Sequence, residues 1–220
     1  DLVHGGGLRR KLSEYAWFLP LHTCIMPTHL FGLSDQTLEH ITKQLHSCGW
    51  CVADGALPAA AATALAAHAA ALPDEALHRA GVGRAGQHQT LDALRRDHIV
   101  WRDEQRTPDD LWLGAMAQLQ QHLNQHLYLG LQMYEAHYAR YQAGDFYGRH
   151  VDAFKGQSNR VVSTVLYLND GWPVDNSAGG ELVLYADETA HHIAPALARL
   201  VVFLSEDLPH EVLPAQRTRH

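Results

Sequence analysis

The chain has 220 residues and a formal net charge of −7 at neutral pH, with 46% hydrophobic and 19% charged residues. This length allows one or two domains with a substantial core. The acidic balance argues against nucleic acid or an anionic membrane as a partner, because both bind through a positive field, and no apolar run reaches the about 18 residues of a membrane-spanning helix.

The first part of the chain, residues 1–25, differs in composition from the rest. It combines the glycine run Gly5–Gly7 with the basic run Arg9–Lys11 and a short apolar stretch. A signal peptide would need a longer apolar core and a small-residue cleavage site. We therefore interpret residues 1–25 as a leader or tag-like extension and residues 26–220 as a single domain.

The three cysteines do not predict a disulfide framework, because their number is odd and all lie early in the chain. Cys48 and Cys51 have the spacing of a redox motif, but they follow a helix-like segment, whereas an active thiol needs a helix N-terminus. No second pair completes a zinc site. We expect reduced, partly buried thiols in a cytoplasmic protein.

Three helices are expected in the first part of the domain. Ser34 can cap a helix that runs to about Ser47, with apolar residues on one face. An alanine-rich helix over 59–72 follows Pro58 and ends at Pro73. A third helix begins at 107–110 and continues with leucines at helical spacing to Leu127. Between the second and third helices, the glycine-rich segment 81–92 predicts a mobile loop.

After Gly130 the hydrophobic period changes from helical to two. Short segments rich in β-branched and aromatic residues, separated by turn signals, predict strands. These strands cover residues 133–141, 161–168, 181–185, 200–204 and 211–213. Helices followed by antiparallel strands indicate an α+β fold, with helical support over 34–130 packed on one face of a β-sandwich or jelly roll over 131–220.

His150 and Asp152 are the first candidate metal ligands. In an extended chain, residues two apart project to the same face, so this imidazole and this carboxylate can reach a common point. Such a pair is common by chance, but a late strand delivers another histidine, His210. Two histidines and one carboxylate are typical of the facial triad of a non-haem iron(II) oxygenase, which leaves three metal positions open. A 2-oxo acid can occupy two of these positions and dioxygen the third.

A cation is also expected, to bind the far carboxylate of such an oxo acid. Arg217 and Arg219 follow His210 closely, and an arginine fork is suited to a carboxylate. Both lie at odd offsets from His210, so a bend or bulge is required in either case. The sequence pattern leaves the choice between them open, together with the alternative of two solvated arginines.

Several ordered motifs, over roughly residues 77–219, resemble the prolyl hydroxylase domain enzymes, both their bacterial members and the oxygen-sensing animal ones. The motifs are Tyr141–Asp152, Leu166–Asn169, Trp172, Gly179–Leu182, Arg199–Ser205 and Pro209–Ala215 with Arg219, preceded by Arg95–Trp101. The resemblance implies a distorted double-stranded β-helix core. It also implies iron bound by His150, Asp152 and His210.

The same resemblance implies roles for residues around the metal. Arg219 would bind 2-oxoglutarate, with Tyr141 and Tyr167 contacting the cosubstrate or its surroundings. Arg160 and Trp172 would contact the substrate, and the loop 81–92 would close over a peptide. The family continues past the arginine with an aromatic-rich strand, whereas this sequence stops at His220, so we expect that strand to be missing or lost.

The implied activity is that of a 2-oxoglutarate-dependent dioxygenase that uses Fe(II) and O2, with ascorbate as a candidate reductant, and releases succinate and CO2. The resemblance points to a target proline in a protein, with elongation factor Tu the candidate by analogy with similar bacterial enzymes and oxygen sensing by analogy with the animal ones. We expect a cytoplasmic monomer or weak dimer that binds neither nucleic acid nor membrane.

Three alternatives remain at this stage. The first is an oxygenase of the same chemistry that acts on a small molecule, a nucleobase or another residue. The second is a non-catalytic binding module that keeps the metal site and the fold. The third is a manganese or nickel cupin without an oxo acid, in which Arg219 would have no role.

Overall fold

The computed structural model describes residues 32–80, 93–101, 109–153, 160–173 and 175–220. The helices among them are α1 (Asp35–Cys48), α2 (Ala59–Ala71), α3 (Asp109–Leu127) and the short 3-10 helix η2 (Asp74–Ala76). The strands are β1 (Trp50–Ala53), β2 (His78–Arg79), β3 (His98–Trp101), β4 (His137–Arg140), β5 (Tyr147–His150), β6 (Val162–Leu166), β7 (Leu182–Ala186), β8 (Thr189–Ile193), β9 (Leu200–Leu204) and β10 (His210–Val212).

Helix α1 begins and ends where its sequence indicates. The Ser34 hydroxyl accepts a hydrogen bond from the Thr37 amide at 3.1 Å, which satisfies a backbone donor that the first turn leaves unpaired. The helix ends at Gly49, which has a φ of 81° and donates its amide to the Leu45 carbonyl. Such a left-handed conformation favours glycine. The expected cap at Ser34 is therefore confirmed.

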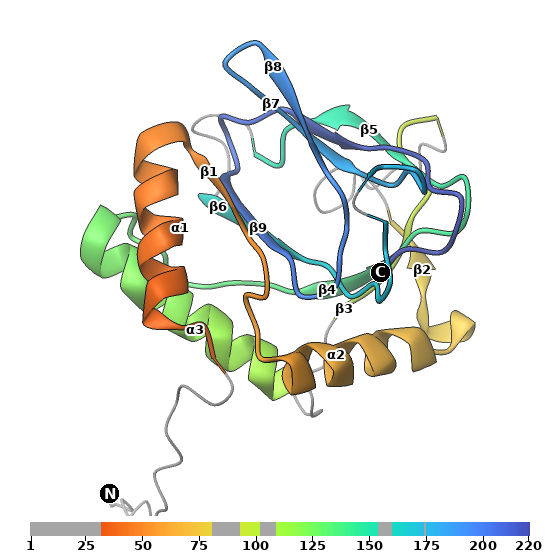
Figure 1. Ribbon diagram of the computed structural model, residues 1–220, viewed down its shortest axis with the longest axis horizontal. Coiled ribbons are helices and arrows are strands. Elements are labelled where there is room, and N and C mark those ends of the chain that lie inside the picture. The colour runs from red at the N-terminus through yellow and green to blue at the C-terminus, as the bar shows by residue number, and fades with distance from the viewer. Residues whose placement is uncertain (1–31, 81–92, 102–108, 154–159, 174) are drawn as a thin grey trace, which may run out of the picture.

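The strands form three antiparallel sheets, with orders β1-β9-β6, β5-β10-β7-β8 and β2-β3-β4. Figure 1 shows the three helices on one side of the β1-β9-β6 sheet and the β5-β10-β7-β8 sheet on its other side. The structure thus confirms the α+β architecture of helices packed on one face of a β-sandwich.

Strand β9 shows how both faces of the middle sheet are buried. Leu200 and Val202 point toward the helices, in one core with Ile41 of α1. Val201 and Phe203, on the opposite face, belong to a second core between the two sheets. Because side chains alternate along a strand, an almost continuous apolar run serves two cores at once.

Five strands, β1, β2, β3, β5 and β8, lie outside the predicted strand ranges. Two of them, β1 and β8, are edge strands of the sandwich. Strand β1 is short and contains Cys51, which we considered mainly as part of a cysteine pair. Strand β8 follows β7 through a two-residue turn of Asp187 and Glu188, both at positive φ. Such turns usually carry asparagine and glycine, so the Asp-Glu pair gave no turn signal in the sequence.

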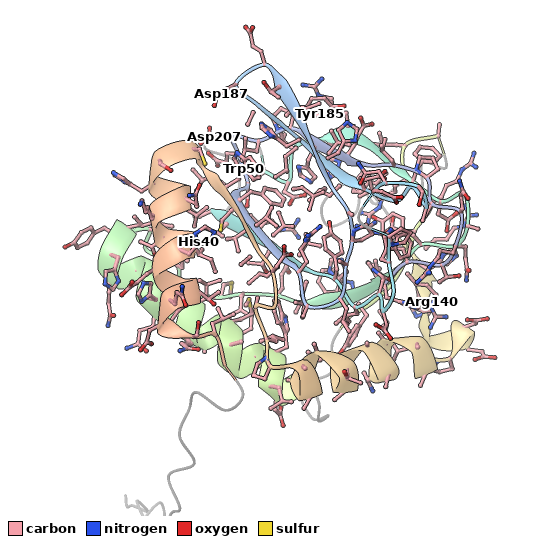
Figure 2. The ribbon with its side chains drawn as sticks, viewed as in Figure 1. His40, Trp50, Arg140, Tyr185, Asp187 and Asp207 are labelled. Carbon is pink, nitrogen blue, oxygen red and sulfur yellow. The ribbon has the colours of Figure 1, made fainter. Side chains whose placement is uncertain are left out.

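The end of α2 is stabilised by a side chain from another part of the chain. Arg140 of β4 is buried, and it lies beside the C-terminal half of α2 in Figure 2. Its guanidinium donates hydrogen bonds to the carbonyls of Ala69 and Leu72 and to the Asp74 carboxylate. A cation at this position satisfies terminal carbonyls and interacts favourably with the helix dipole.

The cysteine pair is split between two elements. Cys48 is exposed at the end of α1, and Cys51 is buried in β1; both are free thiols. Burial is the main cause, and the nearby Cys48 a smaller one, that raises the pKa of Cys51 to about 12, so this thiol stays protonated at neutral pH.

Residues 1–25, Cys24 and the expected loop 81–92 lie outside the described residues. No described helix combines the length and apolar character needed to cross a bilayer.

Candidate metal centre and cosubstrate pocket

The three expected metal ligands meet at one point between the two sheets. His150 ends β5 and His210 begins β10, and these two residues are directly paired across the strands. Asp152 follows β5, and its Oδ1 lies 3.4 Å from Nε2 of His150 and 3.6 Å from Nε2 of His210. One donor atom from each residue lies within 4.8 Å of the others, the only such group of three or more in the described part of the chain.

Backbone carbonyls orient both imidazoles in the same way. Nδ1 of His150 lies 2.9 Å from the Gly148 carbonyl, and Nδ1 of His210 lies 3.0 Å from the Leu208 carbonyl. A carbonyl only accepts, so each Nδ1 carries a proton. Nε2 is therefore the nitrogen of each ring that faces Asp152 and that can bind a metal.

The carboxylate of Asp152 is held by hydroxyl groups on its far side. Oδ2 accepts a hydrogen bond of 2.5 Å from Ser163 Oγ, which lies 2.8 Å from Ser205 Oγ. Burial by itself would raise the pKa of Asp152, but contacts with the two imidazoles and with Ser163 hold that pKa well below its usual range. The group is therefore ionised at neutral pH, and Oδ1 is left to face the metal position.

The serines were missed in the sequence, although a signal for one of them exists. Ser163 stands opposite Phe203 in the pairing of β6 with β9, and the next residue on this face, Val165, stands opposite Val201. A polar side chain on an otherwise apolar interior face needs a partner. Alternation along β6 could therefore have identified Ser163, whereas nothing local indicates Ser205.

Arg219 is buried in the interior, whereas Arg217 is exposed. Arg219 is only 4% exposed, and its Nε and Nη1 have no hydrogen-bond partner among the described residues. Its guanidinium carbon lies 4.7 Å from the ring centre of Tyr141 and 5.1 Å from that of Tyr167. A buried cation with unpaired donors is costly unless an anion completes the site.

The backbone settles which arginine enters the core. Tyr141 and Arg219 exchange amide-to-carbonyl hydrogen bonds of 2.9 and 2.8 Å, which draws the end of the chain along the end of β4. Gly180 has a φ of 77°, and a Cβ there would lie 2.9 Å from Ala215 Cβ and 3.5 Å from Arg219 Cδ. Arg217, in contrast, is exposed and donates to the Asp170 carbonyl at 2.8 Å.

The tyrosines named from the sequence pack against the guanidinium of Arg219. Tyr141 and Tyr167 are both buried, and the Tyr167 hydroxyl has no hydrogen-bond partner of acceptable geometry among the described residues. Burial raises the pKa of each tyrosine, and the positive charge of Arg219 offsets part of that rise. Both hydroxyls therefore stay protonated at neutral pH and can donate a hydrogen bond.

The two residues expected to contact substrate are placed differently. Arg160 is exposed and forms an ion pair with Glu135 at the surface. Trp172 is 5% exposed and packs in a small cluster with Ala178, Ala194 and Ala215. The structure brings neither side chain into the triad, and the burial of Trp172 leaves little of its surface for a substrate.

The donor set fits ferrous iron and a 2-oxo acid. Imidazole nitrogen and carboxylate oxygen on one side of an ion are typical of non-haem iron(II) oxygenases, whereas zinc sites more often contain thiolates. Unpaired donors of Arg219 and a protonated Tyr167 hydroxyl match the carboxylate of an oxo acid. Among the buried polar atoms without a partner in the described residues, Nε and Nη1 of Arg219 and the Tyr167 hydroxyl are thus the ones that a cosubstrate would satisfy.

Known proteins are similar to this chain in sequence and in fold. Residues 136–220 match the 2OG-Fe(II) oxygenase superfamily. A prolyl-4-hydroxylase from Pseudomonas putida is 40% identical with a TM-score of 0.74, over 83% of this chain and 94% of that one. A prolyl hydroxylase from Trichoplax adhaerens, in complex with a hypoxia inducible factor oxygen degradation domain peptide fragment, is 25% identical with a TM-score of 0.73, over 84% and 86%.

A more distant structure shares the fold. The viral collagen prolyl hydroxylase of Paramecium Bursaria Chlorella virus-1, in its 2OG complex, is 16% identical with a TM-score of 0.54, over 79% of this chain and 93% of that one. A search of curated proteins found no significant match.

Proposed function

We propose that this chain, which belongs to the 2-oxoglutarate- and iron(II)-dependent oxygenases of the prolyl 4-hydroxylase type, hydroxylates a prolyl residue of a protein substrate. The observation that carries the proposal is the convergence of His150, Asp152 and His210, together with the burial of Arg219 against Tyr141 and Tyr167. These tyrosines belong to the same apolar cluster as Phe203, which packs against His210. The triad alone would suit several metal-dependent reactions. A buried arginine with unpaired donors adds the requirement for an acidic cosubstrate.

Each residue of the site has a role that its position supports. The two imidazoles and Asp152 would bind iron on one side and leave the other side for cosubstrate and O2. Bound iron, 2-oxoglutarate and O2 supply the oxidation, in which the oxo acid becomes succinate and CO2 and one oxygen atom enters the substrate. The surrounding apolar residues, including Phe203 against His210, exclude water from the reacting groups.

Arg219 would bind the far carboxylate of 2-oxoglutarate. Its fork can pair with both carboxylate oxygens, and the rings of Tyr141 and Tyr167 both pack against the guanidinium. The Tyr167 hydroxyl is a second candidate donor to the same carboxylate. This arrangement would fix the oxo acid at its far end while its near end chelates the metal, so that its orientation is set before O2 binds.

The substrate class is inferred from the similar enzymes. The Trichoplax enzyme was solved with a peptide fragment bound, which supports a protein substrate here. Elongation factor Tu remains the candidate by analogy with bacterial enzymes. Arg160, exposed beside Glu135, is suited to the rim of a peptide site. Trp172 is buried with three alanines, so it would act on a substrate through that packing. The free thiols of Cys48 and Cys51 are consistent with the cytoplasm.

Mass spectrometry can test the proposal directly. The enzyme is incubated with Fe(II), 2-oxoglutarate, ascorbate and elongation factor Tu, or with the lysate of a cell, and peptides are searched for one added oxygen. We expect the addition on a specific proline, together with stoichiometric succinate. The Asp152→Ala variant is the control, because it lacks one iron ligand but keeps the surrounding fold, and it should produce neither product.

The alternatives give different results in the same assay. Succinate that forms only with a small molecule or nucleobase would support the same chemistry on another substrate. An oxygen added to a residue other than proline would correct the target residue and keep the reaction type. One iron bound per chain, without decarboxylation of 2-oxoglutarate under any condition, would support a non-catalytic module and contradict the proposal. Measuring the rate against O2 concentration would test the expected oxygen sensing.

A further inference from the structure

Three further side chains, those of Tyr147, Arg95 and Asp97, follow His150 in a line of successive contacts. The Tyr147 ring lies parallel to the His150 imidazole, with 3.6 Å between ring centres and 14° between planes. The Arg95 guanidinium carbon lies 4.2 Å from the centre of the same tyrosine ring. Asp97 accepts two hydrogen bonds from Arg95, of 2.8 and 2.7 Å. The series thus runs from a buried carboxylate, through a cation and an aromatic ring, to a metal ligand.

The backbone holds this stack in place. Arg95 and Tyr147 form an antiparallel bridge. On either side of it, the Gly148 amide donates to the Leu94 carbonyl at 2.7 Å and the Arg96 amide to the Phe146 carbonyl at 3.0 Å. Asp97 is 1% exposed, so its pairing with Arg95 is shielded from water. Each member is therefore fixed by its neighbours as well as by its own backbone.

His150 needs such support more than His210 does. One hydrogen bond, from Nδ1 to the Gly148 carbonyl, fixes one edge of the imidazole but leaves the ring able to tilt about that contact. His210 is 5% exposed and has Phe203 against its ring. For His150, the flat Tyr147 ring defines the plane in which Nε2 points toward Asp152.

We propose that Tyr147 is a positioning residue for the metal centre, with Arg95 and Asp97 as its support. The tyrosine ring sets the plane of the His150 imidazole, and the cation on its far face keeps the ring in place. The hydroxyl of Tyr147 has no part in this role. The inference concerns metal affinity and is independent of the substrate proposed above.

The adjacent residues offer a matched control. The Arg96 guanidinium carbon lies 5.1 Å from the ring centre of Phe146, a second arginine–aromatic pair one residue away in each segment. Consecutive side chains of an extended segment point to opposite faces, so this pair points away from His150. Removal of the Phe146 ring changes a similar contact at a similar place in the chain without touching a metal ligand.

The test measures Mn(II) binding by the full chain, by electron paramagnetic resonance, without 2-oxoglutarate, substrate or O2. We expect Tyr147→Leu to weaken Mn(II) binding by about 10–100-fold, the range for outer groups that orient a metal ligand. Tyr147→Phe should bind Mn(II) with an affinity close to that of the unsubstituted chain, because it keeps the ring. Phe146→Leu should leave the Mn(II) affinity unchanged.

Three results would overturn the inference. Unchanged Mn(II) affinity in Tyr147→Leu would show that the ring does not position His150. An equal loss in Tyr147→Phe would assign the effect to the hydroxyl. An equal loss in Phe146→Leu would show general loosening of the segment. The thermal unfolding midpoint of each metal-free variant identifies any that fails to fold; Tyr147→Met, of similar length but without a ring, then replaces Tyr147→Leu and should show the same loss.

Discussion

His150 and His210 are direct cross-strand partners in the antiparallel pairing of β5 with β10, with 4.2 Å between their ring centres. Paired residues of an antiparallel ladder project to the same face, so the register of β10 decides whether the site exists. A slip of one residue would turn His210 outward and bring Glu211 to the interior. The pairing becomes irregular before Val212, so regular register is kept at the histidine and lost beyond it.

The hydroxyl of Ser163 should determine how tightly the site binds iron. Ser163→Ala removes the hydrogen bond to Oδ2 of Asp152, so the carboxylate can rotate away from the metal. We expect about a 10–100-fold loss in metal affinity, measured as the Fe(II) concentration that gives half-maximal succinate production and by direct Mn(II) titration. Thr164→Val is the matched control, because Thr164 faces the helices and contacts Met116; an equal loss there would contradict the role of Ser163.

Arg219 should control the affinity for 2-oxoglutarate, and Arg217 should not. Arg219→Gln removes the charge that would pair with the far carboxylate, and hydrogen bonds to charged groups are worth about 1.5–3 kcal/mol. We expect the KM for 2-oxoglutarate to rise by about 10–100-fold at that cost, while Mn(II) affinity is unchanged. Arg217→Gln alters only a surface contact with Trp172 and the Asp170 carbonyl. A similar rise in KM for both variants would refute the assignment.

Arg140 should be important for stability and have no direct part in the chemistry. Arg140→Met leaves the Ala69 and Leu72 carbonyls without their donor at the end of α2. We expect the free energy of unfolding to fall by about 1.5–3 kcal/mol, measured by urea denaturation. Asp74→Asn should cost less than about 1 kcal/mol, because the Asp74 side chain is 88% exposed. If the two variants were equally destabilised, the ion pair rather than the helix cap would be responsible.

The two described cysteines should differ in reactivity. Alkylation of the native protein at neutral pH should label Cys48, which is exposed, and leave Cys51 unmodified. Burial raises the pKa of Cys51 to about 12, so very little of the reactive thiolate forms in the folded state. Peptide mass mapping after timed alkylation measures both rates, and unfolding in urea should make them similar. Rapid labelling of Cys51 in the native protein would contradict its placement in the core.

The strands were predicted where an apolar or alternating segment lies between turn signals, and were missed where these signals are weak. Strand β9 matches the predicted range 200–204, since its apolar run lies between turns. Other strands differ by a few residues at their ends, as β4 does: it covers His137–Arg140 within the predicted 133–141. Strand β8 was missed because its face toward solvent is polar and its turn lacks glycine. Such strands form because a neighbouring strand is available, which is not a local property.

The sequence by itself determined the Ser34 cap of α1, the change of period after Gly130 and the shared face of His150 and Asp152, because these depend on neighbours within a few residues. Only the tertiary structure decided that His210 completes the triad, that Ser163 and Ser205 support Asp152, and that Arg219 enters the core. Arg217 and Arg219 have the same parity along the chain, so alternation cannot distinguish them. Backbone pairing of Arg219 with Tyr141 does so, because strand register is set by contacts between distant segments.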